Sequence, residues 1–325
     1  MHNPKVWIQA ARVSASFALL TTPALATEPG DKNQNGAEVH STQFRTRAFH
    51  GVIGDNTRGP NEHAPGFNGL WSLVPAGTEE NMIGRQLAGL NLEHYINGTD
   101  EDGKKPEILF DPRRSPMEFK QVSDSRFLLH QPPTRFFGVE SWTEFTVREP
   151  NIIDMSFRCI PRKEIFPNGW LGVFWATYVE APEEPAAHFL GYENPESESP
   201  KWLTTDGIHM VYGQQARVPL KFPGPMRGHT MASTDSRRWA EPFYYAVWRD
   251  HAYLVMFDTD HDLGIYAGKN KTGKGWNPWD FQIIIHEPAV GSQYELRIRM
   301  VLDKFKGKDW IKKEFHKWRI CWEIE

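Results

Sequence analysis

The segment GVFWATYVEAPEEPAAHFLG, residues 172–191, decides the fold class. If its first half is a strand, one face carries Phe174, Tyr178 and Glu180, and the other carries Val173, Trp175, Thr177 and Val179. A one-sided surface strand alternates apolar and polar residues, so bulky side chains on both faces indicate a strand covered on both sides. Two interpretations of its end are open: a core strand that stops, or the wall of a binding cleft. The cleft is favoured, because core packing does not account for the Tyr178 hydroxyl and the Glu180 carboxylate.

Alternation with a period of two recurs along the chain from about residue 118. In YELRIRMVLD (294–303), apolar residues at every second position predict a half-exposed strand. Comparable strands are expected in SRFLLHQ (125–131), WTEFTVREPNIIDMSFRCI (142–160), GIHMVYG (207–213), EPFYYAVWRDHAYLVMFD (241–258), DFQIIIHEP (280–288) and WRICWEI (318–324). Only KDWIKKEFHKW (308–318) has a helical pattern, and it is short. Many strands separated by short turns predict an all-β fold, a large antiparallel β-sandwich with few short helices.

The N-terminal residues predict export. A basic leader precedes a short apolar run that ends at the small-residue triplet ALA (24–26), which is the arrangement of a cleavable signal peptide over residues 1–26. A membrane anchor is the alternative, but the apolar run is shorter than the roughly 20 residues that span a bilayer. Residues 27–43 are expected to be a disordered polar leader, and residues 44–325 a single β-sandwich domain. The predicted location is therefore periplasmic or extracellular, without a membrane span.

The composition excludes several functional classes. The formal net charge of −4 is spread without a basic stripe, which argues against partners such as nucleic acid or an anionic membrane. The chain lacks the sequence motifs of serine hydrolases, kinases, zincins and CxxC redox proteins. Aromatic residues make up 13% of the chain, and they serve either as strand fillers or as surfaces on which sugar rings stack. Cys159 and Cys321 are expected to be buried free thiols, with a disulfide as the alternative.

Charged residues at expected strand ends are candidates for a site. Glu93 and His94 are adjacent, so in a regular strand they point to opposite faces and only one of them enters a given cleft. Arg113 and Arg114 lie between prolines in a stiff turn. A guanidinium held there binds a carboxylate or sulfate, or else forms a salt bridge within the protein, and both alternatives are open.

Two further groups combine aromatic and acidic side chains. Glu140 and Trp142 share one strand face with a second glutamate, which is typical either of a solvated face or of a ligand-lined groove. Trp276, Trp279 and Asp280 follow a Gly-Lys loop, in the combination of stacking rings and planar polar groups that sugar sites use. A Trp-rich corner of a sheet is the alternative for the second group.

No cofactor is predicted. The chain has 13 histidines, but none of them shows the spacing of a metal-binding motif. A divalent metal is the alternative if distant histidines meet in the fold. The histidines that would have to meet are His63, His94, His130, His188, His209 and His229.

An exported, aromatic-rich β-sandwich with Glu, His, Arg and Tyr at its strand ends resembles carbohydrate-active sandwich proteins, namely galactose mutarotase-like proteins and many polysaccharide lyases. The resemblance covers the presumed sandwich and matches no family signature, so it assigns no catalytic residues. It implies an exported enzyme that acts on a glycan or sugar derivative by acid/base chemistry, as a lyase, hydrolase or epimerase in an aromatic-lined cleft. A non-catalytic glycan-binding protein of the periplasm or cell envelope is the alternative.

Residue types then suggest roles within such a site. Acid/base chemistry needs a carboxylate or histidine with a shifted pKa, a tyrosine can donate a proton, and an arginine can bind an acidic group of the substrate. The catalytic candidates are Glu180, His188, Tyr178, Glu140, Glu93 and His94. The substrate-binding candidates are Arg113, Arg114, Trp142, Trp175, Trp276, Trp279 and Asp280. The expected partner is a carbohydrate ligand or substrate.

Overall fold

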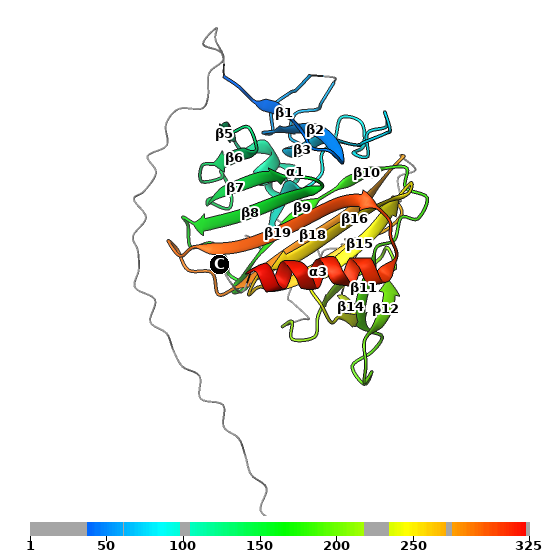
Figure 1. Ribbon diagram of the computed structural model, residues 1–325. Helices are drawn as coiled ribbons and strands as arrows, with labels where there is room; N and C mark the ends of the chain where they lie inside the picture. Colours follow the sequence, from blue (N-terminus) through cyan, green and yellow to red (C-terminus); the bar gives the residue numbers. More distant parts are fainter. Residues whose placement is uncertain (1–37, 61, 98–104, 218–233, 271–274, 323–325) are drawn as a thin grey trace, which may run out of the picture.

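The computed structural model describes residues 38–60, 62–97, 105–217, 234–270 and 275–322, without the side chains of residues 321 and 322 (Figure 1). Strands dominate the structure and helices are few, so the all-β prediction is confirmed. The predicted signal peptide and the first part of the predicted leader lie outside the described residues. Within the described ranges, no helix is long and apolar enough to cross a membrane.

Two sheets make up the described structure. The smaller one consists of β1 (Ser41–Arg45), β2 (Phe49–Gly54) and β3 (Gly69–Pro75). The larger one consists of β4 (Asn91–Ile96), β5 (Glu118–Ser123), β6 (Arg126–Gln131), β7 (Val139–Arg148), β8 (Ile152–Pro161), β9 (Trp170–Ala176), β10 (Tyr178–Glu180), β11 (His188–Tyr192), β12 (Lys201–Thr204), β13 (Met210–Gly213), β14 (Thr234–Trp239), β15 (Phe243–Trp248), β16 (His251–Asp258), β17 (Asp262–Ala267), β18 (Trp276–His286) and β19 (Tyr294–Lys304). Its strand order is β4-β9-β18-β17-β13-β14-β11-β15-β16-β19-β8-β7-β6-β5, with β10 paired to β18 and β12 paired to β11. Two single-turn helices, α1 (Pro106–Leu109) and α2 (Asp111–Arg114), follow β4.

The larger sheet folds over so that its two halves pack face to face around one apolar core (Figure 1). We call the half made by β4, β9, β18, β17 and β13 the first layer, and the half made by β15, β16, β19, β8, β7, β6 and β5 the second layer. Between them, the Phe157 ring meets the Trp175 ring edge-on with centroids 4.8 Å apart, and the Phe257 and Phe281 centroids are 5.0 Å apart. The predicted β-sandwich is therefore confirmed.

The segment formed by β9 and β10 lies inside the first layer, where β9 runs between β4 and β18 and β10 pairs with β18. The side chains of Val173 and Trp175 belong to the core between the layers. Those of Phe174 and Tyr178 belong to a second apolar cluster, on the outer face of the first layer. The strand is thus covered on both faces, as its bulky side chains predicted.

A C-terminal helix, α3 (Lys308–Trp322), covers part of the outer face of the second layer (Figure 1). The prediction of a strand in WRICWEI is therefore wrong. Ile311, Phe315 and Trp318 recur at helical spacing and pack against the sheet as one buried stripe. The alternation that suggested a strand would have buried Ile320, which is 61% exposed.

Cys159 is a free, buried thiol in the core between the layers. Burial raises the pKa of this thiol, because a thiolate would lose its hydration there. The prediction of a free thiol is confirmed for Cys159, and the side chain of Cys321 lies outside the described residues.

Candidate functional site

A β-bulge in β4 brings two ionisable side chains together. β4 pairs with β9, and the register shifts between Leu92 and His94, so Glu93 is the extra residue of the bulge. Oε1 of Glu93 consequently lies 3.1 Å from Nε2 of His94. The prediction that these two side chains point to opposite faces is wrong, because a bulge interrupts the alternation of a regular strand.

Three further side chains surround the Glu93 carboxylate. The Tyr178 hydroxyl donates to Oε2 at 2.5 Å, and the Asn91 amide donates to the same oxygen at 2.9 Å. Nη1 of Arg113 lies 3.9 Å from Oε1. Burial by itself would raise the pKa of this carboxyl group, but the charges of His94 and Arg113 and the hydrogen bonds outweigh it and hold the pKa of Glu93 below its usual range. Glu93 is therefore an ionised carboxylate.

His94 adds a positive charge to the site. Its Nδ1 lies 2.8 Å from the carbonyl oxygen of Leu109, which can only accept a hydrogen bond, and its Nε2 faces the Glu93 carboxylate. Both contacts are favourable only when each ring nitrogen carries a hydrogen, so the geometry assigns the imidazolium form. The rings of Phe110 and Phe174, with centroids at 4.6 and 5.2 Å, hold the imidazole in place.

Asp280 is the second carboxyl group of the site. It lies buried on β18, where Oδ1 accepts the Thr177 backbone N–H at 3.0 Å. Burial raises the pKa of Asp280 well above its usual range, and the negative charge of Glu93 adds to the effect. Two neighbouring carboxyl groups are thus shifted in opposite directions, so Glu93 keeps its charge while Asp280 keeps its proton to a higher pH. A pair of this kind can serve as base and acid.

Aromatic rings form the walls around these polar groups. The Phe67 and Trp276 rings both meet the Tyr178 ring edge-on, with centroids 5.6 and 4.7 Å away. Tyr178 and Asp280 retain 8% and 7% exposure, whereas Trp175 in the core between the layers has 0%. These two residues of the outer face therefore keep a small exposure that the core between the layers lacks.

Arg113 separates this site from the surface. Its guanidinium stacks over the rings of Phe67 and Phe110, at 3.8 and 4.8 Å from their centroids, and Nε donates to the Gly66 carbonyl oxygen at 2.7 Å. A surface hollow of about 510 Å³ opens beside it. We use the name Glu93–Asp280 site for the group Glu93, His94, Arg113, Tyr178 and Asp280.

Several residues singled out in the sequence therefore lie together in space. They are Glu93, His94, Arg113, Tyr178, Trp276 and Asp280. Arg114 lines the adjoining hollow. Glu180 does not join them, although it follows Tyr178 in β10, because it lines a separate hollow of about 560 Å³ with His63, Trp71 and Arg85.

Other candidates lie on the outer face of the second layer. His188 stacks on Tyr245, a residue of the apolar cluster under α3, with ring centroids 4.8 Å apart. The placement of His188 and Tyr178 in one cleft is therefore wrong, because they lie on opposite outer faces of the sandwich. Glu140 pairs with Arg162 and His130, and Trp142 lies against the His130 ring and the Arg158 guanidinium. Because these side chains are paired with one another, the group is interpreted as a solvated face and not as a ligand-lined groove.

Trp175 and Trp279 are wrong as substrate-binding residues. Both side chains are 0% exposed and belong to the core between the layers. The indole N–H of Trp279 donates to the Pro185 carbonyl oxygen at 3.0 Å, which satisfies its polar edge. These two tryptophans are strand fillers, the alternative that the composition left open.

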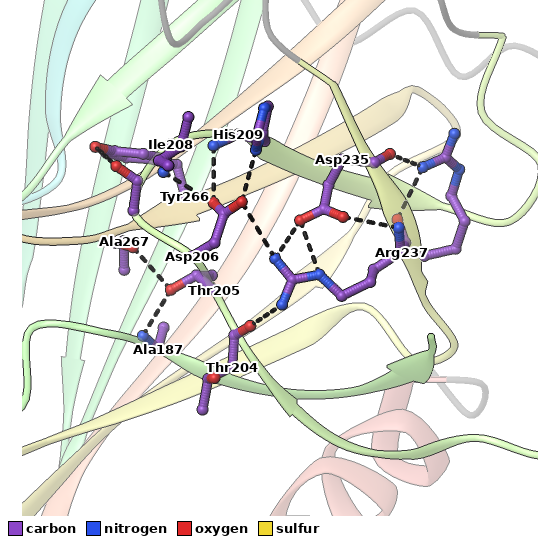
Figure 2. A network of polar contacts seen from close by, with 12 residues as sticks. Ala187, Thr204, Thr205, Asp206, Ile208, His209, Asp235, Arg237, Tyr266 and Ala267 are labelled. Carbon is purple, nitrogen blue, oxygen red and sulfur yellow. Dashed lines mark hydrogen bonds and ion pairs between the residues drawn. The ribbon is translucent and has the colours of Figure 1, made fainter. Parts of the chain in front are cut away.

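Among the described residues, one cluster has the ligand types of a metal site: Asp206, His209 and Asp235, whose ligand atoms lie within 4.8 Å of one another. Figure 2 shows that Arg237 reaches into it, where the guanidinium pairs with Asp235 and lies 3.5 Å from Oδ2 of Asp206. Burial acts to raise the pKa of Asp206, but its hydrogen bonds to His209 outweigh this and lower it. Because the Arg237 guanidinium already lies between the two carboxylates, the cluster does not fit a divalent cation. His63, His94, His130 and His188 lie elsewhere, each with its own partners, and His229 lies outside the described residues.

Asn91, Phe67 and Phe110 are residues of the site that were not predicted from the sequence. Phe67 and Phe110 come from the loop before β3 and from the turn between α1 and α2, where no periodic pattern marks them. A usable signal existed for Asn91. It lies two residues before Glu93, so two polar side chains at alternate positions of the strand indicated a shared polar face.

Solved structures with a similar arrangement of strands are distant in sequence. No family model and no curated protein matches the chain. A protein from Escherichia coli K12, provisionally assigned as an aldose 1-epimerase, is 9% identical, with a TM-score of 0.46 over 82% of this chain and 100% of that one. A galactose mutarotase-like protein from Lactobacillus casei ATCC 334 is 10% identical, with a TM-score of 0.46 over 81% and 100%. At this level of similarity the likeness concerns the arrangement of strands alone.

We expect Asp280→Asn to flatten the dependence of stability on pH. The pKa of Asp280 is raised in the folded state, so its contribution to stability is present below the unfolded pKa of about 4 and is lost as the pH rises toward the folded pKa. In that window this one group lowers the free energy of unfolding by up to about 1.4 kcal/mol per pH unit. Asparagine has no proton to lose and keeps an oxygen for the Thr177 N–H. Urea unfolding at a series of pH values above about 4 measures the slope.

Asp124→Asn is the matched control, because Asp124 is exposed in the turn between β5 and β6. It should leave the slope of the wild type unchanged. If Asp280→Asn also leaves that slope unchanged, Asp280 does not carry a raised pKa.

Proposed function

We propose that this protein is an exported enzyme that acts on a sugar or sugar derivative by acid/base chemistry at the Glu93–Asp280 site. The observation that carries the proposal is the pair of buried carboxyl groups on one aromatic-walled face, where Glu93 contacts hydrogen-bond donors and basic groups while Asp280 accepts a backbone N–H, so that their pKa values are shifted in opposite directions. An acid has to hold its proton and a base has to lose it at the same pH, and the two environments meet that demand. The edges and faces of the surrounding rings suit the apolar faces of a sugar.

Proton transfer fits the site better than attack by a carboxylate on carbon. The Glu93 carboxylate accepts hydrogen bonds from Tyr178 and Asn91 and faces the charged His94, and these contacts make it a poor nucleophile. Asp280 can protonate one oxygen of a sugar, while the Tyr178 hydroxyl passes a proton from another oxygen to Glu93. Epimerisation at a hemiacetal carbon needs only such a donor and acceptor. We therefore favour an epimerase over a hydrolase or a lyase.

Export is part of the proposal and rests on residues 1–26. Their basic start, short apolar run and small-residue triplet support cleavage after Ala26. N-terminal sequencing of the exported chain tests this, and a first residue other than Thr27 would contradict that cleavage site.

A glycan-binding protein without catalysis is the second candidate. The hydrogen bonds around Glu93 favour it, because a carboxylate with several donors also serves as a structural anchor. The two functions differ at Asp280, since binding requires no acidic proton there and catalysis does.

Asp280→Asn should lower kcat/KM by at least about 100-fold, because asparagine keeps the shape of the side chain without its acidic proton. The assay uses aldoses, glycans and uronates, followed by NMR of the anomeric signals, by release of reducing ends and by formation of unsaturated uronates. A chelator should leave the rate unchanged, since the proposed acid and base need no metal.

The control for this assay is Glu140→Gln, which alters a carboxylate next to a histidine on the opposite outer face. It should keep wild-type activity. Full turnover by Asp280→Asn excludes Asp280 as the acid, whereas glycan binding without turnover of any compound by the wild type supports the second candidate.

Tyr178→Phe should lower kcat/KM at every pH, because the hydroxyl that relays the proton is lost, and should move the acidic limb of the remaining activity to higher pH. The Tyr178 hydroxyl helps to lower the pKa of Glu93, so its removal raises that pKa and Glu93 becomes an ionised base only at a higher pH. Initial rates across the pH range measure the shift. An acidic limb at the same pH in wild type and variant would mean that Glu93 is not the base.

A further inference from the structure

The hollow beside Arg113 is lined by cationic side chains. Its lining includes Asn56, Gly66, Phe110, Arg113, Arg114 and Ser115, with no aspartate or glutamate among the described lining residues. The acidic residue of the same turn, Asp111, is buried, and its carboxylate accepts the backbone N–H groups of Phe136 and Phe137. Among the described residues, the lining of the hollow therefore carries positive charge, and the Glu93 carboxylate lies behind it, on the far side of Arg113.

Arg114 is available to a ligand. Its side chain is exposed, and it forms no hydrogen bond or ion pair with any part of the chain that the structure describes. The turn that carries it is rigid, because the Asn56 amide donates to the carbonyl oxygens of Pro112, Arg113 and Ser115 at 3.2, 3.3 and 2.7 Å. Two guanidinium groups thus project from a fixed backbone, which reduces the entropy lost when they bind a ligand.

The charges behind the hollow favour an anion as well. Arg113 and the His94 ring both face the single carboxylate of Glu93, and Arg114 adds a further basic group at the hollow. Nη1 of Arg113 lies 3.9 Å from Glu93, which is longer than a direct hydrogen bond. The Arg113 guanidinium therefore keeps N–H groups that Glu93 does not use.

We propose that Arg114 and Arg113 bind the negatively charged group of an acidic sugar derivative whose ring extends to the Glu93–Asp280 site. The inference rests on the proposed function and adds the substrate class. A guanidinium recognises a carboxylate, a sulfate or a phosphate by two parallel N–H···O contacts, so these groups share one recognition chemistry. Phe110, which lines the same hollow, supplies an apolar surface for the ring.

Binding is the direct test, because it does not depend on turnover. Glucuronate, glucose 6-sulfate and glucose 6-phosphate are each titrated into the full chain by calorimetry and compared with neutral glucose. We expect at least one acidic sugar to bind about ten times more tightly than glucose, with an affinity that falls as the salt concentration rises. The comparison among the acidic sugars shows which charged group is preferred.

Arg114→Gln should remove this preference, with about a tenfold increase in Kd for the acidic sugar and no change for glucose. Arg45→Gln, at an exposed position on β1, controls for the loss of one positive charge and should bind like the wild type. Thermal unfolding confirms that both variants are folded.

Three results overturn the proposal: no binding of any acidic sugar, equal binding of acidic and neutral sugars, or equal binding by Arg114→Gln and Arg45→Gln. A preference that depends on Arg114, in a protein that turns over no sugar, supports this inference and contradicts the enzymatic function instead.

Discussion

The burial of the Glu93 carboxylate is the constraint on which the rest of the site depends. A carboxylate removed from water loses several kcal/mol of hydration unless hydrogen bonds and opposite charges replace it. At Glu93 the replacements come from three segments that are distant or offset in the sequence: Asn91 in β4, Tyr178 in β10 and Arg113 in α2. Satisfying one charge therefore fixes the positions of β4, β10 and the α2 turn relative to one another, and the same contacts shape the site.

One environment produces both an acid and a base because the partners differ. Burial acts on Glu93 and Asp280 in the same direction and disfavours the charged form of each. Glu93 has cations and hydrogen-bond donors beside it, whereas Asp280 has a backbone N–H and the negative charge of Glu93. The strand between them is covered on both faces, by the core between the layers and by the outer aromatic cluster. Because water is excluded there, the difference in partners has a larger effect on the two pKa values.

The sequence predicted strands best where the side chains alternate clearly, as in β7 and β19, and it failed at α3, where alternation and helical spacing overlap in the same residues. It also selected Tyr178, Asp280 and Arg113, since polar groups in apolar strands and arginines in stiff turns are visible from residue type alone. It misplaced Trp175 and Trp279, because composition does not distinguish a tryptophan that fills a core from one that lines a cleft.

By itself the sequence determined the fold class and the kinds of side chain available for a site, because the period of apolar residues and the chemistry of each residue are local properties. Only the tertiary structure decided which of these residues meet. The bulge at Glu93 depends on the register of β4 against β9, and the contact of Arg113 and Tyr178 with Glu93 depends on how distant segments pack. Register and packing are set by the summed burial of many side chains, so no single stretch of sequence encodes them.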